Sequence, residues 1–451
     1  MGFFYNLFFK NNEPSLKQKA QSTPITFPII GNGGINWLND NSQQYITSGY
    51  AGNPVIYSIV KQISEKMSAV PFYLYEIKND RSLKRYKALN QSNNLISYDG
   101  FVTKSQSLKE VDSHKIIDLL EQPNPNQSFS DFIKNYIGYK LITGNSYIYG
   151  QSPELGKNKG LITGMTVLPS QLMNIISLNP SEVDYYDIIG GNTRINKESI
   201  CHLKYWNPDF SSGLQHYGQS PLKAALKVMQ LHNTAYKSQA SILDNKGAYG
   251  FLSDASGAAS EEQLQQLKDR FSNAENGEFM VASADLKWTQ IAQPTEDLMI
   301  LDSLNLTKQD LCNIYGFPSL LLGGDDKTFL NFETAQKSLI YDTVVPELTS
   351  LRDALNKWIL PAYEKADGKK YFIDFDISVL PQLAGDMTEI IGQLSQMWWV
   401  TGNEKRIASK YGADTSNKLM DTYLVPQGLV PIDELSIDID TTGNQDLSDY
   451  Q

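Results

Sequence analysis

Apolar residues recur at helical spacing shortly after residue 50, in the segment NPVIYSIVKQISEKMSAVPFYLYE. Pro54 suits the first turn of this helix, where its missing N–H is not needed. Pro71 marks the end, because the residue before a proline avoids the α conformation. The following FYLYEI predicts a strand, and the charged residues 77–112 predict an irregular surface loop. The apolar stripe consists of Ile56, Ile59, Val60, Ile63 and Met67.

Residues 122–150, QPNPNQSFSDFIKNYIGYKLITGNSYIYG, repeat this order of helix and strand. The PNPN cluster predicts a turn, and Ser128 or Ser130 can cap the helix that follows. Gly144-Asn145 indicates a left-handed helix end, and SYIY is prone to form a strand. Further strands are expected at GMTVLP, YDIIG and SICHLKYW, so the pattern predicts an α+β domain. The apolar stripe of this helix is Phe129, Phe132, Ile133, Tyr136, Ile137 and Leu141.

A different pattern begins at GQSPLKAALKVMQLHNTAYKSQASILDNKG. Ser220 can cap a long helix, Pro221 suits its first turn, and Gly247 can end it after roughly 37 Å. The helix is only weakly amphipathic, because Lys, Gln, Asn and Ser interrupt its apolar positions. Such helices pack against copies of themselves or bridge two domains.

The next segment, residues 248–293, predicts a small insert with its own strands and a helix at SEEQLQQLKDRFSN. Ser260 and Gln263 form a capping box at the start of that helix. Strand-like stretches flank it, at YGFLS and at EFMVAS and LKWTQI. The insert is therefore expected to be a small α/β domain.

The remaining chain is mostly helical by pattern. A helix through EDLMILDSLNLTKQDLCNIYG is ended by Gly316 and Pro318, and the Gly/Asp-rich loop LLGGDDKTFLNF follows. A long helix over ETAQKSLIYDTVVPELTSLRDALNKWILP contains Pro346, which predicts a kink. KYFIDFDIS predicts a strand, and helices resume at residue 382 with a break at residues 401–402. The polar end, DTTGNQDLSDYQ, is expected to be mobile.

Composition narrows the function. The chain has 451 residues, enough for two or three domains, and a net charge of −11. A protein that grips nucleic acid over a broad face is expected to be basic, so tight DNA binding is excluded. An acidic surface is still compatible with DNA that must pass without sticking.

Cysteine usage and the N-terminus exclude other classes. Cys201 and Cys312 are far apart and outside any CxxC spacing, which argues against disulfides and zinc and fits a reducing cytoplasm. The apolar start MGFFYNLFF is too short to span a membrane and lacks signal-peptide features, so it predicts at most a short docking segment. No other stretch is apolar enough to cross a bilayer.

Catalytic motifs find little support. GGDDKT lacks the glycine before lysine that a phosphate loop needs, and Asp325 and Asp326 would repel a phosphate. GGNTR at residue 190 predicts a hairpin turn. GQSPL does not match a nucleophile elbow. The histidines have no metal-ligand spacing: His114, His202, His216 and His232.

Paired carboxylates leave one enzymatic alternative open. Asp374 and Asp376 alternate along a predicted strand and share a face, as do Asp438 and Asp440. Such pairs can hold Mg²⁺ in a nuclease, although a solvated strand face explains them equally well.

Two aromatic features suggest contacts. Trp398 and Trp399 lie in a predicted helix poor in Lys and Arg, which favours core or interface packing over base stacking. Lys327, Phe329 and Phe332 follow a Gly-rich stretch and have the composition of a mobile contact loop, although a plain interhelical loop fits as well.

Five segments in this order resemble the portal proteins of tailed double-stranded DNA bacteriophages, from about Asn53 to about Gly412. None is a catalytic motif, which fits a scaffold such as residues 122–150 that carries no chemistry. The first 50 residues and the tail carry no match. The segments are NPVIYSIVKQISEKMSAVPFYLYE, LLEQPNPNQSFSDFIKNYIGYKLITGNSYIYG, HYGQSPLKAALKVMQLHNTAYKSQASILDNKG, NIYGFPSLLLGG and NFETAQKSLIYDTVVPELTSLRDALN.

The resemblance implies an α+β, multi-domain portal-type subunit with a wing, a helical stem, a small α/β clip and a helical crown, forming a ring. Its expected parts are a variable N-terminal segment at 1–50, the first part of the wing at 51–218, a stem helix at 219–247, the clip at 248–296, a second stem helix at 297–316, a tunnel loop at 317–332, the long kinked helix and a wing strand at 333–380, the crown at 381–440 and a mobile tail at 441–451.

The resemblance also implies a non-enzymatic conduit, without cofactor or metal, through which double-stranded DNA is packaged and ejected. Its expected partners are eleven further copies in a twelve-subunit ring, the major capsid protein, the terminase large subunit and the head–tail connector, and no membrane. The location implied is the portal vertex of the virion head, after assembly in the bacterial host cytoplasm.

DNA-facing residues are expected in the tunnel loop and the stem. Twelve copies at −11 total −132, so DNA, with one negative charge per roughly 1.7 Å, would be held only weakly. Local contacts are expected from Lys223, Lys227 and Lys237 on the stem, and from Gly323, Gly324, Asp325, Asp326, Lys327, Thr328, Phe329 and Asn331 in the tunnel loop.

Two alternatives stay open at this point. One is a metal-dependent DNA-processing enzyme that uses Asp374 and Asp376. The other is a portal-like shell or connector component without a motor partner.

Overall fold

The computed structural model describes residues 42–91, 97–177, 182–189, 193–209, 211–244, 250–254, 262, 265, 286–290, 300–323, 328–409, 411–412, 414 and 416–422. The chain forms two compact units. The larger comprises Met1–Tyr75 and Val111–Asp376, and the smaller comprises Glu76–Glu110 and Ile377–Gln451. Among the described helices, none is both long and apolar enough to cross a bilayer.

The larger unit starts with the predicted helix and strand. Helix α3, Pro54–Ser68, is capped by Asn53, whose side-chain oxygen accepts from the N–H groups of Val55 and Ile56. Strand β1, Phe72–Ile77, follows as expected. The chain is folded before residue 51, since a π-helical turn, Tyr45–Tyr50, precedes α3 and buries Tyr45.

Helix α7, Phe129–Thr143, and strand β3, Asn145–Gln151, confirm the second prediction. Helix α6, Lys115–Glu121, precedes them. Of the two serines considered as the cap of α7, it is Ser128 whose Oγ accepts from the N–H of Asp131, at 3.2 Å. Gly144 ends the helix with φ of 78°, a left-handed conformation that glycine adopts without strain.

Two antiparallel sheets form beside α7. β3 is the centre of the first, between β4, Gly164–Leu168, and β8, Ile200–Lys204. The second contains β5, Met173–Ile176, β6, Tyr185–Ile188, and β7, Thr193–Asn196. Ile188 faces Thr193 across the antiparallel β6–β7 pair, as a hairpin at GGNTR requires, although residues 190–192 lie outside the described residues. The sheets share a core of Tyr147, Leu168, Met173, Ile175, Tyr186, Ile188, Ile195 and Ile200.

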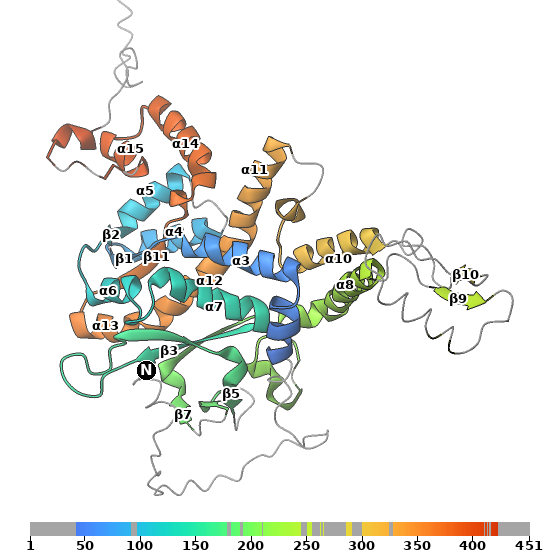
Figure 1. Cartoon of the computed structure of the whole chain (residues 1–451). Coiled ribbons are helices and arrows are strands. Elements are labelled where there is room, and N and C mark those ends of the chain that lie inside the picture. Colours follow the sequence, from blue (N-terminus) through green and yellow to red (C-terminus); the bar gives the residue numbers. More distant parts are fainter. Residues whose placement is uncertain are drawn as a thin grey trace, which may run out of the picture. The chain divides into compact units, whose positions relative to one another are not determined.

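Two long helices of the larger unit lie side by side (Figure 1). Helix α8, Pro221–Asp244, contains 24 residues, and helix α10 is Ile300–Ile314. Strands β9, Gly250–Asp254, and β10, Leu286–Gln290, pair antiparallel within the predicted insert. Gly247 and the capping box of Ser260 and Gln263 lie outside the described residues.

The long helix predicted around Pro346 contains a π-helical segment just before this proline. Helix α11, Phe329–Ser338, continues through a π-helical segment, Leu339–Val344, into α12, Val345–Trp358. Pro346 has no N–H to donate to the preceding turn, which accounts for the irregular hydrogen bonding just before it. Helix α13, Leu360–Asp367, then leads to β11, Tyr371–Phe375, which lies beside β1.

The smaller unit corrects the prediction of an irregular loop at 77–112. That segment forms α4, Asp80–Gln91, α5, Tyr98–Ser107, and the short strand β2, Leu108–Glu110. In α4 the inward-facing Leu83 and Tyr86 stand among basic residues, so the apolar stripe is too sparse to stand out. The unit also contains α14, Ala384–Gln396, and α15, Gly402–Ala408.

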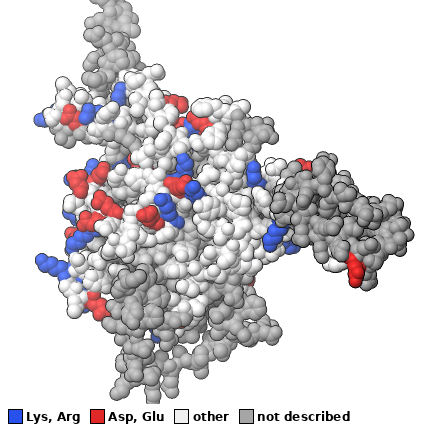
Figure 2. Space-filling model, viewed as in Figure 1, with Lys and Arg blue, Asp and Glu red and all other residues white. Residues whose placement is uncertain are grey.

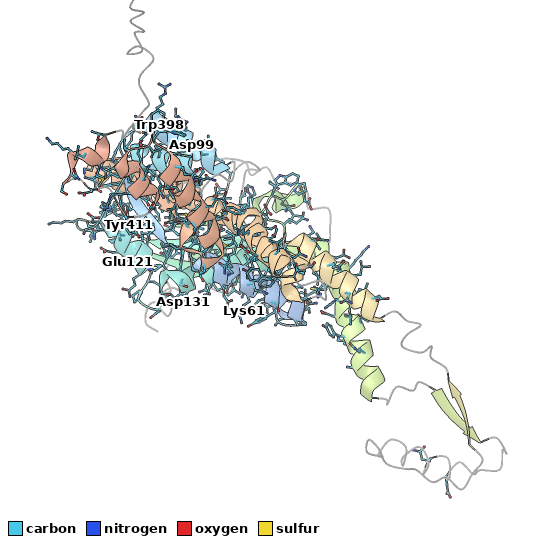
Figure 3. The ribbon with its side chains drawn as sticks, turned by 90° about the horizontal axis from the view of Figure 1, so that it is seen from above. Lys61, Asp99, Glu121, Asp131, Trp398 and Tyr411 are labelled. Carbon is cyan, nitrogen blue, oxygen red and sulfur yellow. The ribbon has the colours of Figure 1, made fainter. Side chains whose placement is uncertain are left out.

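The predicted break at residues 401–402 is confirmed by a capping box. The hydroxyl of Thr401 accepts from the N–H of Glu404, whose carboxylate accepts from the N–H of Thr401. Helix α14 ends before Trp398 and Trp399, so the expectation that they lie in a helix was wrong. They are 42% and 52% exposed (Trp398 is labelled in Figure 3), which excludes core packing. The core here consists of Leu394, Val400 and Ala408, with Phe101, Ile390 and Met397 against it.

Candidate nucleic-acid interface

Helix α8 carries all three lysines predicted for the stem, and each is exposed. At about 100° of rotation per residue, Lys227 and Lys237 lie about 40° to either side of Lys223. Residues 221–243 include no Asp or Glu, so this face has no competing negative charge of its own. Elsewhere, basic and acidic side chains are interspersed on the visible surface (Figure 2). The lysine face of α8 is therefore a local cationic stripe on an acidic protein.

The opposite side of α8 packs on α10. Leu222, Ala225 and Met229 are buried, and so is His232 one turn further. His232 Nδ1 lies 2.7 Å from the hydroxyl of Thr307 on α10, and burial lowers the pKa of His232. The Thr307 hydroxyl donates to the carbonyl of Ser303, so the N–H at Nδ1 donates to the hydroxyl oxygen. This bond fixes the two helices in register.

The C-terminal end of α7 anchors both long helices. Backbone carbonyls in the last turn of a helix have no partner within it. The Ile142 carbonyl accepts from the Ser220 hydroxyl at 2.6 Å, and Ser220 Oγ in turn accepts from the N–H of Leu222 at the start of α8. The Leu141 carbonyl accepts from the hydroxyl of Tyr315, directly after α10, at 3.2 Å. The helix within residues 122–150 thus positions α8 and α10.

Asn145 completes this anchor, and sequence reasoning missed its role. Its side chain bonds both backbone groups of Gly218, accepting from the N–H at 2.6 Å and donating to the carbonyl at 3.1 Å. Nε2 of His202 donates to the same Asn145 oxygen at 3.0 Å, and the ring stacks on Tyr147. Burial, with minor repulsion from Lys204 and His216, lowers the pKa of His202 to about 3. The ring is therefore neutral at pH 7.

Acid is expected to destabilise the fold through His202. The folded pKa of about 3 lies below the ordinary value of 6.5, so between these values the unfolded chain binds the extra proton. The free energy of unfolding then falls with decreasing pH, by about 1.4 kcal/mol per unit, or about 2 kcal/mol from pH 6.5 to pH 5. His202→Gln keeps an amide donor toward Asn145 but does not titrate. In urea titrations at pH 6.5 and pH 5, its free energy of unfolding should therefore fall by about 2 kcal/mol less than that of the wild type. Equal losses in both proteins would contradict this assignment.

The predicted tunnel loop is shorter than expected. Residues 324–327, which include Gly324, Asp325, Asp326 and Lys327, lie outside the described residues. Gly323 has φ of 106°, and its carbonyl accepts from Lys308 Nζ of α10 at 3.0 Å. Thr328 caps α11, so Phe329 and Asn331 belong to the first turn of that helix instead of a loop. Phe329 and Leu330 are 85% and 70% exposed there.

The carboxylate pair is not a metal site. Asp374 is fully buried and its Oδ1 lies 3.3 Å from Nη1 of Arg352, whereas Asp376 follows the end of β11 and is partly exposed. Alternation along a strand could not distinguish a solvated pair from a buried ion pair. Within the described part of the chain, no three His, Cys, Asp or Glu side chains cluster as metal ligands. Asp438 and Asp440 lie outside that part.

The remaining candidate groups have structural roles. His114 caps α6 and its Nε2 lies 3.0 Å from Asp367, while His216 is buried. Cys201 and Cys312 are buried free thiols, as expected. Burial raises their pKa values to about 12 and about 11, which makes them poor nucleophiles.

Comparisons with known proteins agree with this scaffold-like geometry. An uncharacterized protein of Rickettsia bellii (strain RML369-C) is 27% identical over 318 residues, which cover 68% of this chain and 80% of the relative. The fold resembles that of a chain in the neck of a native gene transfer agent (GTA) particle. The TM-score is 0.57 and the identity 23%, and the match covers 83% of this chain and 94% of the neck chain. The neck of an empty GTA particle gives 0.58 and 24%, with the same coverage.

The described residues form a packed scaffold in which the candidate catalytic groups have structural partners. The model of the phage portal protein family matches residues 54–409, most of the chain. The chain therefore belongs to the phage portal protein family. It is a portal protein, a non-enzymatic conduit for double-stranded DNA, and nothing in the described part of the chain supports the metal-dependent enzyme.

Proposed function

We propose that α8 lines the DNA channel and touches the passing duplex through Lys223, Lys227 and Lys237. The observation that carries this proposal is the exposed lysine face on a helix without an acidic residue before Asp244, in a chain of net charge −11. Exposed lysines are strongly hydrated point charges, and salt screens their attraction to phosphate. Such contacts form and break easily, which suits a wall along which DNA slides.

The further assignments of the parts are based on the family to which the chain belongs. Residues 248–296 form the clip, which docks the terminase large subunit and later the head–tail connector. Residues 317–332 contain the tunnel loop, and residues 381–440 form the crown inside the head. The ring contains twelve subunits, contacts the major capsid protein and assembles in the host cytoplasm. Twelvefold symmetry is supported by the resemblance to a GTA neck computed with C12 symmetry.

The ring is tested by the mass and shape of the purified protein, using light scattering and negative-stain imaging. A closed ring of twelve subunits with a hole wide enough for a duplex is the expected result. A different subunit count would overturn the twelvefold assignment. A central hole too narrow for a duplex would overturn the channel.

The lysine face is tested by photo-crosslinking in DNA-filled heads. A benzophenone amino acid replaces Lys227, and in a matched chain it replaces Lys157, which is also exposed but lies in a loop between β3 and β4. We expect protein–DNA crosslinks from position 227 and only background from position 157. Equal yields at the two positions would contradict a channel-facing α8.

A further inference from the structure

Helix α4 presents a cationic face in the smaller unit. Its sequence DRSLKRYKALNQ contains four basic residues and one acidic residue. Leu83 and Tyr86 are buried, and on the opposite side Arg81, Lys84 and Arg85 fall within an arc of about 100°. These three side chains are exposed, and among the described residues no carboxylate forms an ion pair with them. The face is therefore open to an anionic partner.

This arrangement does not serve the stability of the helix. Asn79 caps α4 by accepting from the N–H groups of Arg81 and Ser82, so Arg81 lies in the first turn together with Asp80. A cation there opposes the positive end of the helix dipole, and Asp80, which also lies four residues before Lys84, offsets only part of the positive charge. Arg81 and Arg85 are also four residues apart, a spacing at which like charges repel. A face that costs stability, in an acidic chain, calls for a ligand to balance it.

We propose that this face of α4 binds the sugar–phosphate backbone of duplex DNA. The inference rests on the proposed function, because it takes the DNA in the head as the ligand. Arg81 and Arg85 are separated by about 6 Å along the helix axis, so the two guanidinium groups are far enough apart to contact different phosphates of one strand. Guanidinium groups also match phosphate oxygens with paired hydrogen bonds. Binding is independent of base sequence, since only backbone phosphates are contacted.

A competing occupant is present in the chain itself. Residues 433–451 contain six acidic and no basic residues: Asp433, Glu434, Asp438, Asp440, Asp446 and Asp449. Duplex DNA is favoured because its phosphates are regularly spaced at high charge density, whereas these carboxylates are irregularly spaced along the chain. A chain ending at residue 432 separates the two occupants.

The test measures the affinity of the assembled protein for a fluorescent 30-base-pair duplex between 50 and 200 mM salt. The variant Arg81→Gln, Lys84→Gln, Arg85→Gln is compared with a control of equal charge change, Lys157→Gln, Lys159→Gln, Lys365→Gln, whose lysines are exposed on the larger unit. We expect the α4 variant to bind at least tenfold more weakly at 50 mM salt. Its slope of log affinity against log salt should fall by about 2.7 per engaged subunit. The control should match the wild type.

Each outcome decides the proposal. Equal affinity and slope for the α4 variant and the wild type would overturn it. The proposal would also be overturned if duplex binding depended on α4 only in the chain that ends at residue 432. In that case the acidic residues 433–451 would occupy the α4 face in the full chain. The mass of the ring is measured on every sample, so that failure of the α4 site can be distinguished from failure of the portal assembly. Intact rings that have lost duplex affinity support the α4 site. A wild type that forms no rings contradicts only the portal assembly.

Discussion

Replacing Gly144 with alanine is expected to lower the free energy of unfolding by about 3 kcal/mol or more. Its φ of 78° is unfavourable for any residue with a Cβ. The added Cβ would also lie 2.5 Å from the carbonyl carbon of Gln219 and 2.6 Å from the nitrogen of Ser220. Both are backbone atoms at the entry to α8, so the strain can be relieved only by moving the start of α8 away from the end of α7.

Gly138→Ala provides the control within the same helix. A Cβ at that position meets nothing within 4 Å, and alanine in a helix interior is more stable than glycine by about 0.5–1 kcal/mol. Urea unfolding of the two variants should give effects of opposite sign. Light scattering should show that Gly144→Ala also impairs ring formation where the subunit is still folded. A change within about 0.5 kcal/mol would mean that this junction is looser than its contacts indicate.

The elements that the sequence predicted well are those whose signals are local. For α3 and α7, the cap, the apolar stripe and the terminating residue all lie within about 20 residues, and each acts through short-range hydrogen bonds or sterics. The lysines of α8 share a face by helical periodicity, and their expected contact with DNA stays a prediction. Such features require no knowledge of what the element packs against.

The features that the sequence did not reveal depend on distant partners. The bonds from Asn145 to Gly218 join residues 73 positions apart, and Gly144-Asn145 by itself indicated only a helix end. In α4, two inward residues among basic ones looked like a loop until α5 supplied the surface they cover. Asp374 resembled a metal ligand because alternation along a strand specifies the face, not what the face meets.

Replacing Asp374 with asparagine is expected to lower the free energy of unfolding by about 3–5 kcal/mol, because it removes the buried countercharge of a buried guanidinium. Only 3% of the Arg352 side chain and 1% of the Asp374 side chain are exposed. The rings of Phe372 and Phe375 lie 5.7 and 5.5 Å from the guanidinium carbon and recover only part of this loss.

Asp353→Asn is the matched control, because it removes the other carboxylate from the same arginine. Asp353 Oδ1 lies 3.0 Å from Nε of Arg352, but this side chain is 59% exposed, so water takes over and the cost should stay below about 1 kcal/mol. Urea unfolding with and without Mg²⁺ compares the two variants. A metal site would show the reverse pattern, with Asp374→Asn tolerated and Mg²⁺ stabilising the wild type. A structural ion pair predicts no effect of Mg²⁺ on any of the three proteins, because Arg352 already occupies the position that a cation would take.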